Sequence, residues 1–471
     1  MDSKVSIYIL LCFVFATLVE GFKPQPKINV EGAIERFLNA LGEYYDAGGI
    51  SSVTRSMIIN EGTVLVPRVR VFGQEEAQNS PYPVTCFRIP AVVQTDSGII
   101  LAFAEARLNT CADCAELGIA MRRSEDGGQT WGEVTWPVPP TFSGPGTYMT
   151  RGGNPTVVYD SKRKQVVLHF NRGMTDLDGD GNYDCIPAVD NFQIVSKDDG
   201  LTWGQVRNIS GFLLEHRGLL SGPGTGAYIP EVDRIIFAGH YQTAERNDGR
   251  VVMYFSDDGG NFKKCYSNPN LKISFLKPNL LLKGETYQIS SSTFPRADEA
   301  SVAHIGGQNL TVNLRRDVNE CDICPPKANG CNCRGRSFSQ DNGLTWSNME
   351  LDPQLHDPIC EGSIVQIGPY TAFSNPPMSY ARANMSIALS TDGGRTWDYR
   401  LKVTDEYQYT DYSSLVNGEL IRGEASTNPM AGLLWGSCLH PIPMRVWCLW
   451  PTSWEIYFSR IELNPDNFVP A

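Results

Sequence analysis

From about Thr63 onward, short runs of strand-forming residues alternate with clusters of glycine, proline, asparagine and aspartate. Ala91-Val92-Val93 and Gly98 to Phe103 are two such runs, typical of neighbouring β-strands. Upstream of Thr63 the spacing is helical instead. Apolar residues there recur at Val30, Ile34, Phe37, Leu38, Leu41 and Tyr45. The pattern therefore predicts a short amphipathic helix followed by a larger all-β domain.

An eight-residue box, Ser-x-Asp-x-Gly-x-Thr-Trp, recurs through the all-β region. The complete copies are Ser124–Trp131, Ser196–Trp203, Ser339–Trp346 and Ser390–Trp397, and Ser256–Phe262 is a degenerate copy. Their starts run from residue 124 to residue 390, a mean spacing of 66.5 residues. A strand-rich repeat of this length is typical of a propeller in which each repeat forms one four-stranded blade. Six repeats need 399 of the 450 residues after residue 21, so the sequence predicts a six-bladed β-propeller with a short N-terminal helical extension.

The box itself favours a structural role over a catalytic one. Its aspartate can fold back to accept backbone N–H groups, and its glycine can adopt a backbone conformation that other residues avoid. Its tryptophan is expected to pack into the blade.

The N-terminus resembles a secretion signal. Lys4 precedes the apolar run Ile7 to Val19, which is shorter than the roughly 20 residues of a membrane span. We therefore expect a signal peptide at 1–21, an extension at 22–62 and the propeller at 63–471. No membrane span is expected in the mature chain, which enters the secretory pathway and ends in the extracellular space or the lysosome.

The cysteines and the charge bear on compartment and ligand. Of 13 cysteines, Cys12 lies in the signal, and an even number in an exported chain favours disulfides over free thiols. Export and the lack of a nearby histidine argue against zinc at Cys321–Cys333. Glycosylation sequons begin at Asn208, Asn309 and Asn384. The net charge of −12 argues against nucleic acid and means that local arginines must capture any anionic ligand.

One acidic stretch resembles the first half of a calcium loop. Asp176, Asp178, Asp180 and Asp184 occupy positions 1, 3, 5 and 9, with Gly181 at position 6. Pro187 stands at position 12, where an EF-hand needs a bidentate glutamate, so a complete EF-hand is excluded. The stretch is either a structural calcium site or a solvated acidic turn. No other cofactor is expected.

Phe87-Arg88-Ile89-Pro90, followed by the boxes, resembles the sialidase (neuraminidase) family, and most closely its lysosomal animal type. The resemblance covers nearly all of residues 86–463. It implies an exo-α-sialidase that hydrolyses terminal sialic acid, with retention, from glycoproteins, glycolipids or oligosaccharides.

The resemblance also implies which side chains bind the sugar acid. Arg88, Arg315 and Arg382 match the three family arginines, with Arg316 as a competitor for the second place. Planar guanidinium groups suit this role because they can bind the substrate carboxylate through two hydrogen bonds at once. Arg107, with Glu105, is expected at the rim of the site or supporting it.

Three further matches imply the chemistry. Tyr412 corresponds to the nucleophile, since a carboxylate nucleophile would meet the negative charge of the substrate. Glu299 corresponds to its base, which a phenol with a pKa near ~10 requires. Asp113 corresponds to the general acid/base and must be protonated to act, so an acidic working pH is expected. Cys111 and Cys114 flank Asp113, and a disulfide there would fix its loop.

The sequence departs from the family pattern at one place. A late glutamate usually braces the first arginine, but here the matching position is Gly436. Either Glu424 substitutes or Arg88 is held differently. Three alternatives to a hydrolase remain: a trans-sialidase, a catalytically silent sialic-acid-binding lectin, and a propeller used for protein docking. The presence of Asp113, Glu299 and Tyr412 favours an enzyme.

Overall fold

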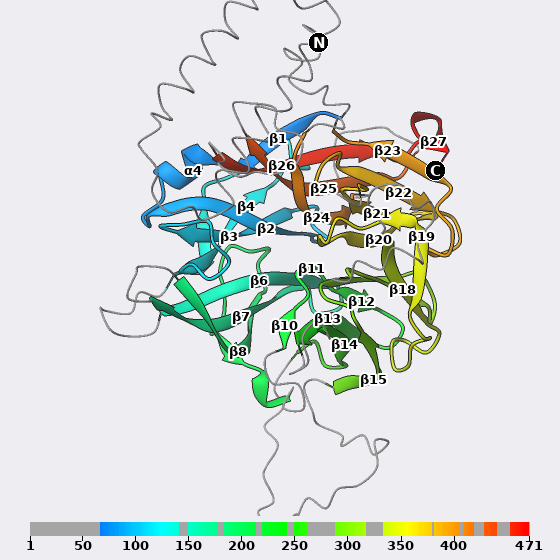
Figure 1. Ribbon diagram of the computed structural model, residues 1–471, viewed down its shortest axis with the longest axis horizontal. Helices are drawn as coiled ribbons and strands as arrows, with labels where there is room; N and C mark the ends of the chain where they lie inside the picture. The colour runs from blue at the N-terminus through cyan, green and yellow to red at the C-terminus, as the bar shows by residue number, and fades with distance from the viewer. Residues whose placement is uncertain are drawn as a thin grey trace, which may run out of the picture. The chain divides into compact units, whose positions relative to one another are not determined.

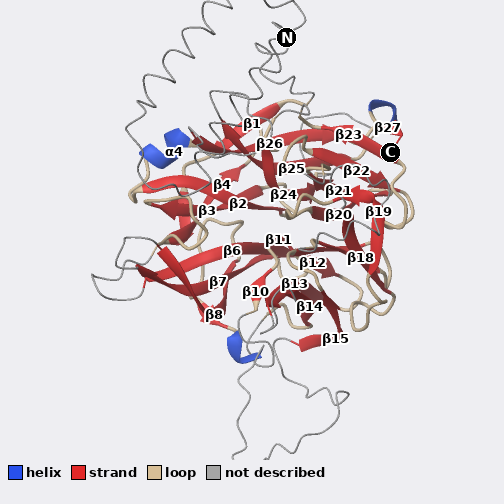
Figure 2. Ribbon diagram, in the orientation of Figure 1, coloured by secondary structure: helices blue, strands red, loops and turns tan. Residues whose placement is uncertain are grey.

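A computed structural model of the chain describes eleven segments: residues 66–140, 149–177, 183–212, 219–242, 249–260, 288–316, 333–378, 381–404, 408–418, 428–439 and 453–470. They form six β-sheets of four or five strands, which are the blades of a propeller (Figure 1). The helical content of these segments is small, as Figure 2 shows. It consists of α4 (Gln74–Gln78) and two 3₁₀ turns, Ser210–Phe212 and Pro465–Asn467. The predicted six-bladed fold is confirmed.

The blades follow one another along the chain. Blade 1 contains β2 (Val84–Gln94), β3 (Ile100–Leu108), β4 (Leu117–Ser124) and β5 (Thr135–Val138). Blade 2 contains β6 (Met149–Asp160), β7 (Gln165–Leu177), β8 (Tyr183–Ser196), β9 (Arg207–Asn208) and β11 (Gly224–Thr225). Blade 3 contains β10 (Leu220–Ser221), β12 (Ala227–Ile229), β13 (Arg234–Gln242), β14 (Gly249–Ser256) and β15 (Gln288–Pro295).

The second half of the ring repeats this plan. Blade 4 contains β16 (Ala300–His304), β17 (Leu310–Leu314), β18 (Cys333–Ser339) and β19 (Glu350–His356). Blade 5 contains β20 (Ser363–Ile367), β21 (Tyr370–Asn375), β22 (Ser386–Ser390), β23 (Tyr399–Lys402) and β27 (Val469–Pro470). Blade 6 contains β24 (Thr410–Asn417), β25 (Met430–Leu439), β26 (Ser453–Glu462) and β1 (Arg68–Phe72).

Blade 6 closes the ring with strands from both ends of the propeller. β1 pairs antiparallel with β26, with Arg68 opposite Ser459 and Val69 opposite Phe458. The first described strand therefore completes a sheet whose other three strands come last in the ring. This pairing joins strands from the beginning and the end of the described propeller in one blade.

The boxes are structural turns, as their residue types predicted. In the first box, Asp126 accepts the backbone N–H groups of Gln129 (3.0 Å) and Thr130 (2.9 Å), and Ser124 Oγ accepts that of Gly128 (2.8 Å). Gly128 has φ +87°, and a Cβ there would lie 2.2 Å from the Phe458 ring. The box therefore needs glycine both for its backbone conformation and for contact between blades.

The box tryptophans join neighbouring blades in the same way. Trp131 of blade 1 packs edge-on against Phe458 of blade 6, with ring centroids 5.4 Å apart. Trp203 of blade 2 packs against Phe103 of blade 1 at 5.9 Å. The tryptophans therefore contribute to packing between blades, where the hydrophobic core lies.

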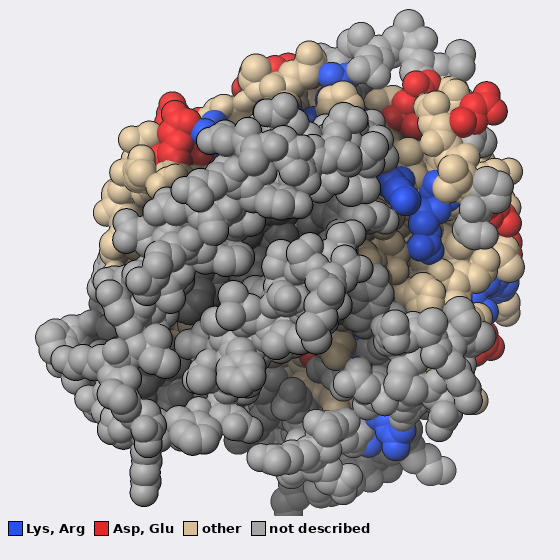
Figure 3. Space-filling view, turned by 45° about the horizontal axis from the view of Figure 1, so that its top comes forward, with Lys and Arg blue, Asp and Glu red and all other residues tan. Residues whose placement is uncertain are grey.

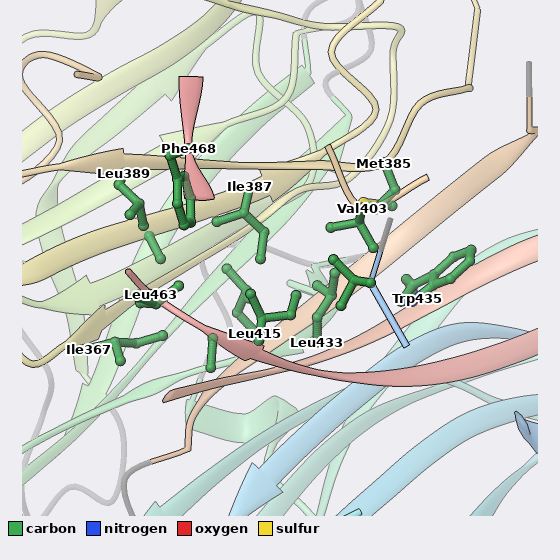
Figure 4. Close-up of a cluster of buried hydrophobic side chains, with 14 of the residues drawn as sticks. Ile367, Met385, Ile387, Leu389, Val403, Leu415, Leu433, Trp435, Leu463 and Phe468 are labelled. Atoms are coloured by element: carbon green, nitrogen blue, oxygen red, sulfur yellow. The ribbon is translucent and has the colours of Figure 1, made fainter. Parts of the chain in front are cut away.

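The core consists of apolar layers between successive blades. Figure 4 shows the layer between blades 5 and 6, where Ile387 and Leu389 face Leu415 and Leu433. All four side chains are almost fully buried. Full burial of such a side chain is worth roughly 1.5–3 kcal/mol, so these layers hold the ring together.

The strand directions separate two faces of the propeller. Each complete box begins at the end of the third strand of its blade, whereas Arg88, Glu299 and Tyr412 lie near the starts of first strands. Because successive strands in a blade run antiparallel, the starts of first strands and the ends of third strands lie on opposite faces. An axial cavity of about 380 Å³ is lined by the later parts of the inner strands, among them Gln94, Tyr159, His304 and Asn417.

Several sequence predictions lie outside the described residues. They are the signal peptide, the helix of the 22–62 extension, most of the cysteine-rich stretch 321–333, and Glu424 as the substitute brace for Arg88. Asp176 and Asp184 are paired across β7 and β8, but Asp178, Asp180 and the side chains of the acidic stretch are not described. Within the described segments no helix is long and apolar enough to cross a membrane, and no cluster of metal-ligating side chains occurs.

The cysteine predictions need two corrections. Cys111 is bonded to Cys86, not to Cys114, which is itself disulfide-bonded. Cys360 is a buried free thiol, so the preference for disulfides does not extend to every cysteine after residue 21. It lies in an apolar contact with Ile89 and Tyr412, an environment that needs a small hydrophobic side chain.

Candidate active site

The phenol of Tyr412 is the centre of the site. Tyr412 lies on β24 and is 7% exposed, and its hydroxyl donates to Glu299, which precedes β16. Burial, followed by the charge of Glu299, raises the pKa of Tyr412 well above its ordinary value, although Arg315 and Arg382 oppose this. The phenol is therefore neutral and already hydrogen-bonded to the carboxylate that can take its proton.

The three predicted arginines surround this phenol. Arg315 Nη1 lies 3.1 Å from the Tyr412 hydroxyl and 2.5 Å from Glu299 Oε2. The guanidinium carbons of Arg382 and Arg88 lie 5.7 and 6.0 Å from the centre of the Tyr412 ring. The structure thus brings all three together on the face opposite the boxes. Their charges suit an anionic group placed next to the phenol.

Arg315 rather than Arg316 reaches the site. Arg315 directly follows β17 and contacts both Glu299 and Tyr412. Arg316 is 3% exposed, and its backbone N–H donates to Asp357 (3.0 Å). Of the two neighbours, Arg315 is therefore the one whose guanidinium group contacts Tyr412 and Glu299.

Arg88 is placed by an irregularity in the Phe-Arg-Ile-Pro strand. β2 contains one extra residue relative to β3 between Arg88 and Ala91, which is a β-bulge. Ile89 within it has φ +54°, a region that side-chain-bearing residues seldom adopt. Such strain persists only where the surroundings impose it, and Ile89 is 5% exposed. The bulge changes the direction of the strand at Arg88.

Asp113 lies at the mouth of the site on the loop between β3 and β4. Its Oδ1 accepts from Arg107 (2.6 Å) and Arg88 (3.3 Å), and its side chain is 80% exposed. Partial exclusion of water raises the pKa of Asp113, but Arg107 and then Arg88 outweigh it, so the net pKa is lowered. Without a ligand, Asp113 is therefore held as a carboxylate, not in the protonated form that acid catalysis requires.

Arg107 and Glu105 support this loop from within blade 1. Glu105 Oε2 accepts from Arg107 Nη2 at 2.8 Å, and both side chains are almost fully buried. Arg107 Nη1 also donates to the Cys111 carbonyl at 2.7 Å. With the Cys86–Cys111 disulfide, these contacts tie the loop to β2 and β3. Arg107 therefore acts mainly on Asp113 and its loop.

Sequence reasoning missed Asp411, the neighbour of Tyr412. Its Oδ2 accepts from Arg88 (2.6 Å) and its Oδ1 from Arg382 (2.8 Å). Burial raises the pKa of Asp411, but the charges of Arg88 and Arg382 outweigh it and lower the pKa to about 2. A carboxylate beside the candidate nucleophile was the available signal in the sequence.

Trp454 was also missed. Its ring lies 4.9 Å from the guanidinium carbon of Arg88, within range of a cation–π contact, and packs edge-on against Tyr409. Trp454 is partly exposed, so Arg88 has an aromatic neighbour that solvent also reaches. No motif or residue spacing in the sequence pointed to Trp454.

Basic and acidic side chains are both present on the face drawn in Figure 3. On the face in Figure 3, the charged side chains of the described residues lie in small groups, with basic ones on the right and acidic ones along the upper edge. The net charge of the whole chain is −12. An anionic ligand therefore depends on the arginines of the site rather than on the overall field.

Comparisons with known proteins agree with this geometry. A model of the family described as BNR repeat-like domain matches residues 98–421. A sialidase of Bacteroides fragilis is 27% identical over 356 residues, covering 70% of this chain and 57% of that protein. A sialidase of Micromonospora viridifaciens is 23% identical over 352 residues, covering 69% and 47%. The chain spans about half the length of these curated relatives.

Solved structures share the fold. A Hadza microbial sialidase has a TM-score of 0.58 at 22% identity, covering 82% of this chain and 66% of that one. A leech intramolecular trans-sialidase has a TM-score of 0.59 at 16% identity, covering 84% and 71%. Since the family match covers more than half of the sequence, the chain belongs to the BNR-repeat sialidase family.

Proposed function

We propose that this protein is a retaining exo-α-sialidase that removes terminal sialic acid from glycoproteins, glycolipids or oligosaccharides. One observation carries the proposal: a buried phenol donates to a carboxylate while three arginines surround it. A lectin needs the arginines but has no use for a nucleophile already paired with a base. A docking propeller needs neither.

The first step forms a covalent intermediate. Arg88, Arg315 and Arg382 hold the substrate carboxylate beside Tyr412, whose oxygen attacks the anomeric carbon while Glu299 takes the phenol proton. Asp113 gives its proton to the glycosidic oxygen, and the aglycone leaves. The substrate carboxylate competes with Asp113 for Arg88, so binding itself favours the protonated acid.

The second step reverses the roles. Asp113, now a carboxylate, takes a proton from water, whose oxygen attacks the anomeric carbon. The bond to Tyr412 breaks, and the phenolate recovers its proton from Glu299. Two displacements at one carbon retain its configuration. Transfer differs only in the acceptor, because a sugar hydroxyl replaces water.

Tyr412→Phe tests the proposal. The variant keeps the ring and its packing but removes the attacking oxygen, so turnover of a fluorogenic sialoside should fall on the order of 10³-fold or more. A sialic-acid analogue should still bind, because the arginines hold its carboxylate independently of the phenol. Near-normal turnover in a folded variant would overturn the mechanism.

A second buried tyrosine offers a matched control. Tyr457 is 7% exposed, like Tyr412, and its hydroxyl also donates to a glutamate, Glu455. Tyr457→Phe should lower the free energy of unfolding about as much as Tyr412→Phe does, but it should leave turnover unchanged.

Adding lactose to the wild-type assay separates the two enzymatic alternatives, since a trans-sialidase forms sialyllactose whereas a hydrolase releases free sialic acid. Secretion or lysosomal delivery is part of the same proposal and is tested by locating the tagged full chain in cells.

A further inference from the structure

A single carboxylate, Asp411, connects three blades at the entrance to the site. Arg88 comes from β2 of blade 1, Arg382 precedes β22 of blade 5, and Asp411 itself lies on β24 of blade 6. The Asp411 side chain is 5% exposed, and each of its oxygens accepts from a different arginine. The Cys360 thiol adds a longer contact to Oδ1 at 3.5 Å.

A bulge on β24 explains how Asp411 and Tyr412 both reach the site. Thr410 pairs with Ser437 and Ser413 with Trp435, so two residues of β24 face the single residue Gly436 of β25. In a regular strand, consecutive side chains point to opposite faces. The extra residue relaxes that alternation and allows a carboxylate and a phenol in direct succession to serve one pocket.

The glycine opposite the bulge faces Asp411 directly. Among the described residues, a Cβ at Gly436 would have two neighbours within 4 Å, Asp411 Cβ at 3.6 Å and the Tyr412 carbonyl at 3.8 Å, both at ordinary van der Waals distance. The described neighbours of this position thus belong to β24. In this chain the carboxylate beneath the two arginines comes from β24.

The two arginines need such a partner. Two guanidinium charges that share one anionic ligand repel each other, and a buried carboxylate between them offsets that repulsion. Arg382 Nη2 is also fixed by the Ile359 carbonyl at 2.5 Å. Each guanidinium group is thus held at one edge by the protein, which fixes the direction of its remaining N–H groups.

We propose that Asp411 is the positioning residue that aims Arg88 and Arg382 at the carboxylate of the substrate. The proposal rests on the proposed sialidase function. Asp411 does not touch the reacting atoms. It acts through the two arginines, so its removal should impair carboxylate recognition rather than the attack by Tyr412.

Asp411→Asn gives a test in which two explanations predict opposite changes in the affinity for an anion. If Asp411 contributes only negative charge, its removal makes the site more positive and an anion binds more tightly. If Asp411 positions the arginines, the anion binds more weakly. We expect a 10- to 100-fold loss of affinity for 2-deoxy-2,3-dehydro-sialic acid by calorimetry, and less than a threefold loss for its uncharged methyl ester. Equal or tighter binding of the acid would overturn the proposal, as would equal losses for both ligands.

Two further variants complete the design. Asp352 is also fully buried and accepts from Trp397 Nε1 at 2.8 Å, away from the site, so Asp352→Asn controls for the loss of a buried carboxylate. It should lower the melting temperature without changing either affinity. If Asp411→Asn does not fold, Asp411→Glu retains the charge but displaces it by one methylene, and wild-type affinity for the acid in that variant would count against positioning.

The outcomes separate this inference from the proposed function. If the wild-type protein neither binds the acid nor cleaves a sialoside, the proposed function fails. If it does both and Asp411→Asn keeps its affinity for the acid, only the role of Asp411 fails.

Discussion

Binding of a sialic-acid analogue should be coupled to proton uptake by Asp113. In the unliganded site Asp113 shares Arg88 with Asp411, and an incoming carboxylate competes for the same guanidinium group. Asp113 then loses one cationic partner and gains an anionic neighbour. Both changes raise its pKa. Asp411, with a pKa of about 2, stays ionised throughout and keeps Arg88 and Arg382 in place.

The size of the effect follows from the exposure of Asp113. Its side chain is 80% exposed, and exposed ion pairs are worth about 0.2–1 kcal/mol. Loss of the Arg88 contact raises the pKa of Asp113, and at about 1 kcal/mol it corresponds to at most about a fivefold change in ligand affinity. Repulsion from the ligand carboxylate acts in the same direction, so we expect a total change in affinity on the order of tenfold.

The sign of the pH dependence follows from this shift. The pKa of unliganded Asp113 is lowered below its ordinary value, and binding raises it. The complex therefore carries more protons than the free protein in the window between the two pKa values, and affinity increases as the pH falls through it. The gain in affinity is complete below the pKa of Asp113 in the free protein.

The assay is calorimetric titration of the acid analogue between pH 6 and pH 3.5, in buffers of different ionisation enthalpy. Proton uptake makes the measured enthalpy depend on the buffer. Asp113→Asn should abolish that dependence, and the uncharged methyl ester should show none in the wild type. An affinity that stays flat or falls with decreasing pH would refute the reasoning, as would the same proton uptake in Asp113→Asn.

Three other predictions test separate parts of the molecule. Arg382→Lys should weaken binding of the acid analogue at least tenfold despite the conserved charge, because an ammonium cannot contact both Asp411 and the ligand as a planar fork does; unchanged affinity by calorimetry would contradict this. Replacing both Cys86 and Cys111 with serine opens a loop spanning 25 residues and should cost about 3.5 kcal/mol in the free energy of unfolding measured by denaturant titration, with a loss of turnover as the Asp113 loop loosens; an unchanged unfolding midpoint would contradict it. If the acidic stretch from Asp176 to Asp184 binds calcium, EDTA should lower the melting temperature and added calcium should restore it; identical melting curves would assign the stretch to a solvated turn.

The fold was predictable because its signal is repeated and local. Each box specifies a turn by side chain to backbone hydrogen bonds within eight residues, as at Asp126, so the pattern survives in the sequence whatever surrounds it. The spacing of the boxes then gives the number of blades. The closing strand β1 carries no box, and its pairing with β26 depends on contacts between residues nearly 400 positions apart.

The residues of the site could be predicted from the sequence only where they belong to a recognisable motif. Arg88 and Tyr412 lie in recognisable stretches, whereas Asp411 depends on a bulge that arises from the pairing of β24 with β25. In a regular strand, where side chains alternate between the two faces, Asp411 and Tyr412 would point to opposite faces of the sheet. The partner of Cys111 was equally hidden, because Cys86 lies opposite Arg107 on the neighbouring strand and close to Cys111 only in three dimensions.

These contacts define how an anion can enter the site. Each arginine already has a carboxylate partner: Arg88 and Arg382 have Asp411, Arg315 has Glu299, and Arg107 has Glu105. An anion therefore binds the N–H groups that these partners leave available, rather than meeting arginines without a counter-charge. Among the described residues, the exposed carboxylate that pairs with Arg88 and Arg107 is Asp113, which is also the predicted acid. A ligand without a carboxylate cannot displace Asp113 from Arg88 and leaves the acid ionised. Recognition of the charged sugar and readiness for catalysis thus depend on the same guanidinium group.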